Sequence, residues 1–203
     1  MARPWLRVAA ALIVSGVLAS CTSSRAAGPS LTKVAMIGDS LAVLGDQQIT
    51  DQLSRAGWKA TVDAFAGVNT LEQMPVMAKA AKSSGTAFVV ELGTNDSHQV
   101  FKGETTPSAE RAQIAAALDL FGTRCVVWVN VDSDPTRPGG SGGAVVNTAL
   151  ASEAAKRPNL HIADLGALLA AHPDYLVDDD VHLTPQGYEA LGQLIATELE
   201  RCR

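Results

Sequence analysis

The amino-acid sequence predicts an α/β fold: a three-layer α/β/α sandwich around a five-stranded parallel sheet in the flavodoxin-like order 2-1-3-4-5. Short apolar runs that suit buried strands alternate with longer segments that show helical spacing. This alternation is typical of a parallel sheet covered by helices on both faces. The length of 203 residues, with 47% apolar and 18% charged residues, suits one folded domain with its own core.

Five apolar runs are expected to form the strands. Most are nearly continuous in apolar residues, as strands buried on both faces are. The second run alternates between apolar and polar residues, which suits a strand nearer the edge of the sheet. In chain order the runs are 33–37 (KVAMI), 58–65 (WKATVDAF), 86–92 (TAFVVEL), 125–131 (CVVWVNV) and 160–163 (LHIA).

The helical segments carry start and stop signals. Thr106 and Thr184 each precede a proline, as an N-cap precedes the first helical residue, and Gly57 and Gly122 end the segments before them. Residues 133–143 (SDPTRPGGSGG) consist largely of turn formers, so we expect an irregular loop there. The expected helices are 46–56, 70–84, 107–121, 144–156 and 184–200.

The first twenty residues have the pattern of a secretory signal peptide. Arg3 and Arg7 are followed by an uncharged, mostly apolar run at 8–18, and small residues lead to Cys21. The run is shorter than the roughly 20 residues that a helix needs to span a bilayer. The alternative is a buried N-terminal helix, although nothing in the sequence caps one.

The end of this segment resembles the cleavage box of bacterial lipoproteins. The resemblance implies that Cys21 becomes the lipidated first residue of the mature protein, and its acyl chains would hold the protein at a membrane surface. Residues 21–30 are small and polar and are expected to form a flexible tether, with residues 31–203 as the folded domain. We therefore expect an extracytoplasmic protein anchored to the cell membrane.

The charge of the chain argues against one class of partner. Removing residues 1–20 takes away two of the 16 basic residues, which leaves 14 basic and 21 acidic residues and a net charge of −7. The sequence shows no basic patch. Nucleic acid is therefore not an expected partner.

Two cysteines besides Cys21 are candidates for a disulfide. Export would place Cys125 and Cys202 in an oxidising compartment, where such a pair can form a bridge. In the chain-entropy model a bridge over this length of chain would stabilise the fold by about 4 kcal/mol. Two separate free thiols are the alternative.

Polar residues directly follow the first three expected strands. The run 38–41 (GDSL) follows the first, Gly67 follows the second, and 93–96 (GTND) follows the third. In open α/β sheets, sites form beyond the carboxyl ends of the strands, where the strand order reverses. The order 2-1-3-4-5 puts the second and third strands on either side of the first, so Ser40, Gly67 and Asn95 are expected to converge.

These runs, together with 179–182 (DDVH), resemble the four blocks of the SGNH, or GDSL, hydrolases. The blocks occur in the family's order and cover the chain from about residue 33 to its end. A single Gly-Asp-Ser is a weak signal, but four blocks at suitable spacing are specific. The resemblance implies a serine esterase without a cofactor. Its triad would be Ser40, His182 and Asp179, and its oxyanion hole would use Ser40, Gly67 and Asn95.

The chemistry of the residues supports His182 as the base. A serine hydroxyl needs a base to attack at neutral pH. Of the four histidines, His161 falls in a strand and is expected to be a core or edge residue. His172 lies between a helix and a loop and is expected to be exposed, and His98 is expected to line the pocket near Asn95.

The three aspartates before His182 are not equivalent. A base histidine must be held in one tautomer by an acceptor at its other nitrogen, and the spacing of three selects Asp179. Asp178 and Asp180 are expected to be solvated loop residues. One histidine beside three aspartates lacks a zinc-like ligand set, and the sequence has no HExxH or CxxC, so no metal is expected.

Each of the proposed roles has a structural alternative. Ser40 can be a helix N-cap, Gly67 an ordinary turn glycine, and Asn95 part of an Asx-turn. Asp39 and Asp96 are expected to bond loop amides and to take no part in catalysis.

The sequence therefore predicts an ester hydrolase that acts on short acyl or acetyl groups of envelope glycan or lipid. One alternative is an acyltransferase that passes the acyl group to a glycan hydroxyl, because the end of the chain also resembles hydrolase-like domains attached to membrane acyltransferases. The other is an inactive lipoprotein that binds envelope glycan or lipid. The complete set of triad residues argues against this last possibility.

Overall fold

The computed structural model describes Met1 and residues 32–84 and 86–203. Apart from Met1, the expected signal peptide at 1–20, the lipidation of Cys21 and the tether at 21–30 fall outside these residues. Within the described part of the chain, the helices are too short or too polar to cross a membrane.

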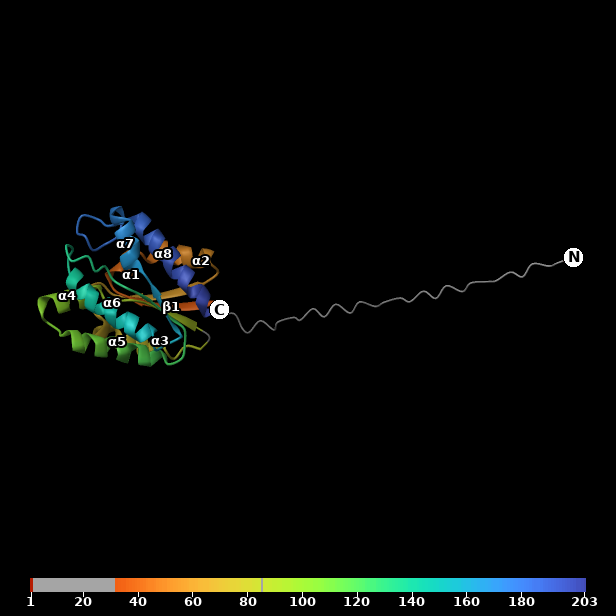
Figure 1. Cartoon of the computed structure of the whole chain (residues 1–203), viewed down its shortest axis with the longest axis horizontal. Helices are drawn as coiled ribbons and strands as arrows, with labels where there is room; N and C mark the ends of the chain where they lie inside the picture. The colour runs from red at the N-terminus through yellow and green to blue at the C-terminus, as the bar shows by residue number, and fades with distance from the viewer. Residues whose placement is uncertain (2–31, 85) are drawn as a thin grey trace.

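One parallel sheet forms the centre of the domain, in the order β2-β1-β3-β4-β5 (Figure 1). This confirms the predicted fold class and strand order. The alternating strand β2 lies at one edge, and β3, all of whose residues are buried, lies in the middle. The strands are β1 (Lys33–Gly38), β2 (Lys59–Ala64), β3 (Thr86–Glu91), β4 (Val126–Val129) and β5 (Leu160–Ala163).

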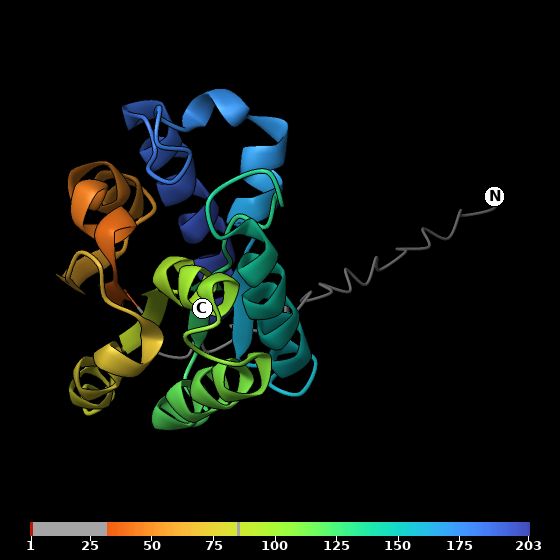
Figure 2. The same cartoon turned by 90° about the vertical axis from the view of Figure 1, so that its left-hand side faces the viewer.

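Helices cover both faces of the sheet. α1, α2, α7 and α8 contribute buried residues to one face, and α3, α5 and α6 to the other. In Figure 2 the blue helices α7 and α8 lie above the sheet and the green helix α5 lies below it. The helices are α1 (Ser40–Leu44), α2 (Asp46–Arg55), α3 (Thr70–Ala80), α4 (Thr94–Lys102), α5 (Pro107–Phe121), α6 (Gly140–Ala154), α7 (Leu165–Ala171) and α8 (Pro185–Leu199), with short 3₁₀ helices at Pro173–Tyr175 and Glu200–Cys202.

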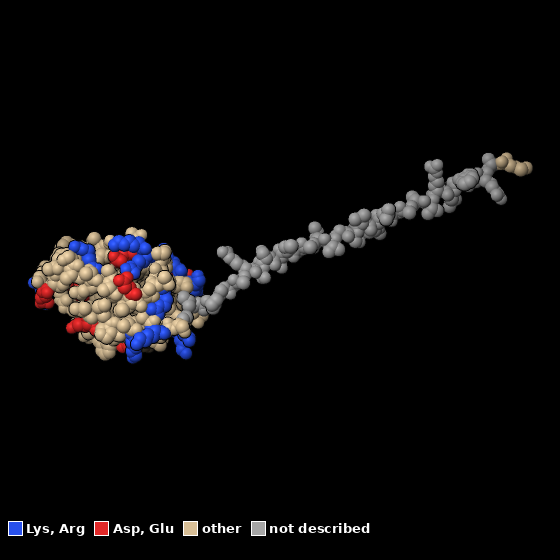
Figure 3. Space-filling model, turned by 90° about the horizontal axis from the view of Figure 1, so that it is seen from below, with Lys and Arg blue, Asp and Glu red and all other residues tan. Residues whose placement is uncertain are grey.

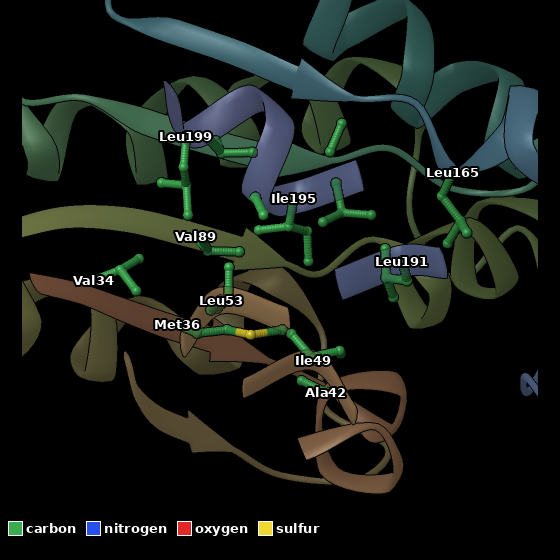
Figure 4. Packing of buried hydrophobic residues seen from close by; sticks show 14 of the residues in the cluster. Val34, Met36, Ala42, Ile49, Leu53, Val89, Leu165, Leu191, Ile195 and Leu199 are labelled. Carbon is green, nitrogen blue, oxygen red and sulfur yellow. The ribbon is translucent and has the colours of Figure 1, made fainter. Parts of the chain in front are cut away.

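The alternation of side chains along each strand divides the core into two clusters. In β1, Val34 and Met36 point toward α2 and α8, whereas Ile37 points toward the layer of α3 and α5. Figure 4 shows the first cluster, in which Leu191 and Ile195 of α8 lie close to the sheet. Burying each such side chain contributes about 1.5–3 kcal/mol, so the two clusters hold the helices onto the sheet.

Most predicted boundaries agree with the structure. α5 and β5 begin and end at the predicted residues, and the Thr106 and Thr184 side chains accept hydrogen bonds from the N–H groups of Ala109 and Gly187, as N-caps do. The short helices α4 and α7 were not predicted. α4 (TNDSHQVFK) has few apolar residues to mark a helix in the sequence, because the residues that it buries, Asp96 and Ser97, are polar.

The prediction of an irregular loop across 133–143 is wrong at its end, because α6 begins at Gly140. A Cβ added at Gly140 or Gly143 would collide with carbonyl oxygens of residues 132–134, and one at Gly142 would collide with the Ser97 carbonyl of α4. The glycines therefore allow close backbone packing of α6 against α4 and the preceding loop. Turn-forming propensity is overridden here by tertiary packing.

Cys125 and Cys202 are joined by a disulfide, with their Cα atoms 5.6 Å apart. Cys125 directly precedes β4, and Cys202 lies in the 3₁₀ helix that follows α8. The bridge therefore fastens the end of the chain to the edge of the sheet at which the strands begin. It encloses a sequence separation of 77 residues.

We expect Cys202→Ser to lower the free energy of unfolding by about 4 kcal/mol, since the bridge restricts a long loop in the unfolded chain. Urea unfolding of the oxidised protein and of the variant measures the difference. Adding a reductant should bring the oxidised protein to the stability of the variant and leave the variant unchanged. Equal stability of the two proteins under oxidising conditions would contradict the structural role of the bridge.

Candidate active site

The candidate site lies at the edge of the sheet where the strands end. α1 begins at Ser40, two residues after the end of β1, and α4 begins at Thr94, shortly after β3. The loop that carries His182 lies between the Pro173–Tyr175 turn and α8. Parallel strands bring their carboxyl ends to one edge, so residues far apart in the sequence meet there.

Ser40, His182 and Asp179 form a continuous chain of side-chain hydrogen bonds. The Oγ atom of Ser40 lies 3.0 Å from Nε2 of His182, and Nδ1 of His182 lies 2.7 Å from Oδ2 of Asp179. The first contact joins residues 142 positions apart in sequence. In this arrangement an imidazole can take a proton from a serine hydroxyl while a carboxylate holds the other ring nitrogen.

The loop 177–183 directs Asp179 at the histidine. Oδ1 of Asp179 accepts hydrogen bonds from the backbone N–H groups of Val181 and His182, at 2.9 and 2.8 Å. Asp180 follows with a φ of 57°, the left-handed conformation that turns the chain. Its side chain lines a different hollow, beside Val181. The structure therefore separates the neighbouring aspartates as the spacing argument expected.

The charge state of Asp179 follows from these contacts. The hydrogen bond from the His182 side chain, followed by that from the His182 backbone N–H, lowers the pKa of Asp179 to about 2. The carboxyl is therefore ionised at neutral pH. Its hydrogen bond to Nδ1 stabilises the tautomer in which Nε2 is free to accept a proton from Ser40.

Two buried carboxyls hold the turn that presents Ser40. Oδ1 of Asp39 accepts from the N–H of Leu41 at 3.0 Å, and Oε2 of Glu91 accepts from the N–H of Ala42 at 3.1 Å. The N–H of Asp39 in turn donates to the carbonyl of Glu91 at 3.1 Å. The first turn of α1 is therefore fastened to the end of β3, which restricts the position of Ser40.

These carboxyls have raised pKa values because they are buried. Burial, partly offset by the hydrogen bond from Leu41, raises the pKa of Asp39 to about 6. Burial and the charge of Asp39 hold the pKa of Glu91 well above its usual value. Burial therefore favours the protonated form of Glu91 in the folded protein.

A further buried carboxyl, that of Asp96, supports the loop after β2, and Glu110 is buried near it. Both oxygens of Asp96 accept from the N–H of Thr70, at 3.0 and 3.1 Å, at the start of α3. Burial, followed by the charge of Asp96, raises the pKa of Glu110 to about 8. The expectation that Asp39 and Asp96 bond loop amides is confirmed by these contacts. Glu91 and Glu110 were missed, although Glu91 is the one charged residue in its strand.

The residues assigned to the oxyanion hole lie beside this turn. Nδ2 of Asn95 donates to Oδ2 of Asp39 at 3.2 Å and to the Val68 carbonyl at 2.9 Å. Gly67 is exposed and has a φ of 79°, which favours glycine. Because both amide protons of Asn95 have protein acceptors here, a substrate oxygen would have to replace one of them.

The other histidines lie apart from the hydrogen-bonded chain. His161 is in β5, and His172 is exposed and stacks on Tyr175, with ring centroids 4.7 Å apart. His98 lies on α4, where Gly139 approaches it closely. Asn147, to which the sequence assigned no role, exchanges two hydrogen bonds with the backbone of Val131 and so closes the loop before α6.

The described residues offer one cluster of three possible metal ligands, made of Cys125, His161 and Cys202. Their ligand atoms lie within 4.8 Å of one another. Two of the three are joined in the disulfide, and a bridged sulfur is not a thiolate ligand. The cluster lies at the edge of the sheet where the strands begin, away from Ser40.

Two hollows border the site. The smaller has a volume of about 20 Å³ and includes Leu41, Thr94 and Val181, the residues next to Ser40, Asn95 and His182. The larger, of about 380 Å³, includes Asp179 and His182 themselves. Its remaining lining is mostly apolar and consists of Leu44, Gln48, Val177, Leu183, Pro185 and Tyr188.

Comparison with known proteins places the chain in a family. The model of the GDSL-like lipase/acylhydrolase family matches residues 20–190. The chain belongs to this family. The resemblance predicted from the sequence blocks is therefore confirmed, and with it a fold shared by lipases and acylhydrolases.

Curated proteins similar to this chain include acyltransferases. The chain is 29% identical over 168 residues to "O-acetyltransferase OatA" of Staphylococcus aureus (strain NCTC 8325 / PS 47), covering 81% of this chain and 24% of that protein. It is 29% identical over 171 residues to "Putative peptidoglycan O-acetyltransferase YrhL" of Bacillus subtilis (strain 168), covering 83% and 24%. The chain thus spans about a quarter of the length of these relatives.

Solved structures share the fold. The C-terminal catalytic domain of Streptococcus pneumoniae peptidoglycan O-acetyltransferase A superposes with a TM-score of 0.69 at 19% identity, covering 84% of this chain and 93% of that domain. A family 3 carbohydrate esterase of Clostridium thermocellum gives a TM-score of 0.64 at 13% identity, covering 83% and 95%. The family fold is therefore used by proteins named for acyl transfer and for ester hydrolysis.

Glu91→Gln is expected to preserve the fold at neutral pH, since an amide reproduces the protonated carboxyl that accepts from Ala42. The folded protein holds the Glu91 proton while the unfolded chain releases it near pH 4.5, so stability of the natural protein should decrease as the pH rises above 4.5. The glutamine variant should lose less stability over that range. Urea unfolding at pH 5 and pH 8 measures both.

Glu91→Ala serves as the comparison for this substitution. It removes the acceptor of the Ala42 N–H and leaves a cavity, so it should cost about 2–4 kcal/mol at either pH. If the glutamine variant and the natural protein lost stability equally between pH 5 and pH 8, Glu91 would not be protonated in the folded state.

Proposed function

We propose that this protein is a serine esterase that hydrolyses carboxylic esters through an acyl-enzyme. The observation that carries the proposal is the row of hydrogen bonds between three side chains. Nε2 of His182 lies 3.0 Å from Oγ of Ser40, and Nδ1 of His182 lies 2.7 Å from Oδ2 of Asp179. Membership of the GDSL-like lipase/acylhydrolase family supports the reaction class.

In the first half of the reaction, Oγ of Ser40 attacks the ester carbonyl while His182 takes the hydroxyl proton. The negative charge on the carbonyl oxygen is stabilised by the N–H groups of Ser40 and Gly67 and by the amide of Asn95, which exchanges one of its protein acceptors for the oxyanion. His182 then gives its proton to the leaving alcohol, and the ester bond breaks.

In the second half, water attacks the acyl group on Ser40 and His182 again acts as the base. The carboxylic acid leaves and the serine hydroxyl is restored. Asp179, ionised at neutral pH, keeps Nδ1 protonated throughout and stabilises the imidazolium that forms. The steps are complete with the side chains of the protein and water, so the proposal includes no cofactor.

The two hollows support a small acyl group and a larger alcohol. A volume of about 20 Å³ beside Leu41 and Val181 accommodates little more than a methyl group. The larger hollow beside His182 can hold the alcohol part of the ester, and its apolar walls suit the face of a sugar ring or a lipid. We therefore propose acetylated glycan or lipid of the cell envelope as substrate.

A second candidate is transfer of the acyl group to a glycan hydroxyl in place of water. It is favoured by the relatives named as O-acetyltransferases, each 29% identical to this chain. The two reactions share the acyl-enzyme and differ only in the acceptor. Measuring released acetate and acetylated glycan, with and without a glycan acceptor, separates them.

An inactive binding protein is the third possibility, and a fluorophosphonate probe that failed to label Ser40 would support it.

We propose export and membrane attachment for this enzyme on the basis of its N-terminal sequence. The basic start, the apolar run at 8–18 and the box that ends at Cys21 support a lipoprotein signal, with residues 1–20 removed and 21–30 as tether. Substrates of the cell envelope agree with this location. Loss of membrane association in a Cys21→Ser variant would test the lipid anchor.

Ser40→Ala is expected to reduce hydrolysis of p-nitrophenyl acetate by about ten-thousandfold or more, because the nucleophile is lost. Asp179→Asn should cause a loss of about a thousandfold to ten-thousandfold through the wrong histidine tautomer. Asp178→Asn, a matched change one residue away, should retain activity within about twofold, because Asp178 is exposed and lines neither hollow. Equal activity of the Asp179 and Asp178 variants would reject the triad.

The smaller hollow should limit the acyl chain. We expect kcat/KM for p-nitrophenyl butyrate to be about tenfold to a hundredfold below that for the acetate, since two extra methylene groups exceed the space beside Leu41. A series of acyl esters on the purified protein, with Ser40→Ala as control, measures the preference. A rate that increases with chain length would contradict this assignment of the hollows.

A further inference from the structure

A groove on the open face of β2 lies far from the hydrogen-bonded chain. Lys33 and Ala35 of β1 stand beside Lys59 and Thr61 of β2, and all four point to the same face of the sheet. α3 packs on β1 at this face, whereas the β2 side chains remain exposed. Among the described residues, none forms a helix over this face of the polar edge strand.

Two adjoining hollows make up the groove, with volumes of about 310 and 250 Å³. They share Ala35, Thr61 and Ser83 as lining residues. Lys33 and Lys59 border the first and Lys79 borders the second. The first is also lined by the hydroxyl-bearing residues Thr61, Ser83, Ser84 and Thr86.

The lysines around the groove are exposed and have no acidic partner. Lys33, Lys59, Lys79 and Lys82 are exposed, and none forms an ion pair with another residue in the ranges 32–84 and 86–203. We call these four side chains the basic rim. Some basic residues elsewhere, such as Arg157, are paired with carboxylates, whereas Lys102 and Arg111 form no ion pair with the described residues. Figure 3 shows blue side chains gathered on the end of the domain where the described chain begins.

The sequence alone showed no basic patch, because these lysines come from three separate segments. The start of β1, the start of β2 and the end of α3 bring them together. Asp63 is the acidic residue of the groove lining, and it lies at the opposite end of β2 from Lys59. The expectation of no basic patch is therefore wrong for the folded chain.

We propose that the basic rim and its groove bind the anionic surface of a lipid bilayer. Phosphate groups of lipid headgroups accept hydrogen bonds from lysine ammonium groups and from serine and threonine hydroxyls. The groove presents these groups on its lysines and on Thr61, Ser83 and Ser84, whereas the Thr86 hydroxyl donates to the Ser84 carbonyl. Each lysine close to an anionic bilayer strengthens binding about fivefold. An excess of carboxylates elsewhere on the chain, whose net charge is −5, favours this one orientation.

The place of the rim in the fold agrees with this partner. Lys33 opens β1, so the preceding segment joins the domain beside the rim. The predicted lipidation site, Cys21, precedes Lys33 by twelve residues, which span at most about 40 Å. Ser40 follows the other end of β1, so binding at the rim would turn the candidate active site away from the bilayer. The inference concerns binding alone and does not depend on the proposed esterase activity.

The parent protein for the test is the full chain with Cys21→Ser, which removes the acylation site. Two variants of this parent are compared with it, and each carries two further substitutions. One neutralises the rim with Lys33→Gln and Lys59→Gln, and the other removes the same charge elsewhere with Lys102→Gln and Arg111→Gln. Partition to phosphatidylglycerol-containing vesicles and to pure phosphatidylcholine vesicles is measured by sedimentation. Thermal unfolding shows that all variants are equally folded.

We expect the rim variant to bind phosphatidylglycerol vesicles about thirtyfold more weakly than the parent protein, and the control variant to bind within about twofold of the parent. Binding to phosphatidylcholine vesicles should be the same for all three, and added salt should weaken the parent's preference for the anionic vesicles. The proposal is overturned if both variants lose binding equally, if the parent shows no preference for anionic vesicles, or if a soluble polyphosphate binds the rim while the vesicles do not.

Discussion

The contact between Ser40 and His182 is the interaction on which the rest of the site depends. It joins the first strand of the domain to a loop 142 residues later, and neither residue has a local reason to be near the other. The parallel sheet supplies that reason, because every strand ends at the same edge and α8 returns along one face. The geometry of the candidate site is therefore a property of the whole fold, and damage to the α8 packing would reach Ser40 through His182.

Holding the serine turn in place requires carboxyls in an environment that disfavours their charge. Asp39 and Glu91 accept backbone hydrogen bonds from the first turn of α1, yet burial raises the pKa of both. Asp96 likewise accepts from the N–H of Thr70 under the loop that leads into α3, and burial together with the charge of Asp96 raises the pKa of Glu110. The candidate site thus rests on buried carboxyls whose charged forms are disfavoured by their surroundings.

The sequence was informative where a residue's role is set by its neighbours along the chain. Strand runs, proline-marked helix starts and the spacing between Asp179 and His182 are local patterns, and the structure agrees with them. The sequence was uninformative where contacts between distant segments decide the conformation or role of a residue. The glycines at 140–143 have the composition of a loop, and their helical conformation depends on the close approach of α4. Glu91 interrupts an apolar strand run in the sequence, and its role is evident only from its hydrogen bond with the first turn of α1. The roles of Gly67 and Asn95 depend on a substrate oxygen, which no local pattern contains.

Different groups lie at the two ends of the strands, so the proposed reaction site and the proposed membrane-binding surface are at opposite edges of the sheet. At the carboxyl ends, carboxylates, an imidazole and small hollows form the proposed reaction site. At the amino ends lie the disulfide, the basic rim and the residue at which the described chain begins. Six-residue strands such as β1 keep these ends about 20 Å apart, which is beyond the screening length of charges in salt solution. Lys33 and Lys59, at the starts of their strands, therefore have little electrostatic effect on Ser40 and His182, so attachment to a surface and the proposed reaction can change largely independently of each other.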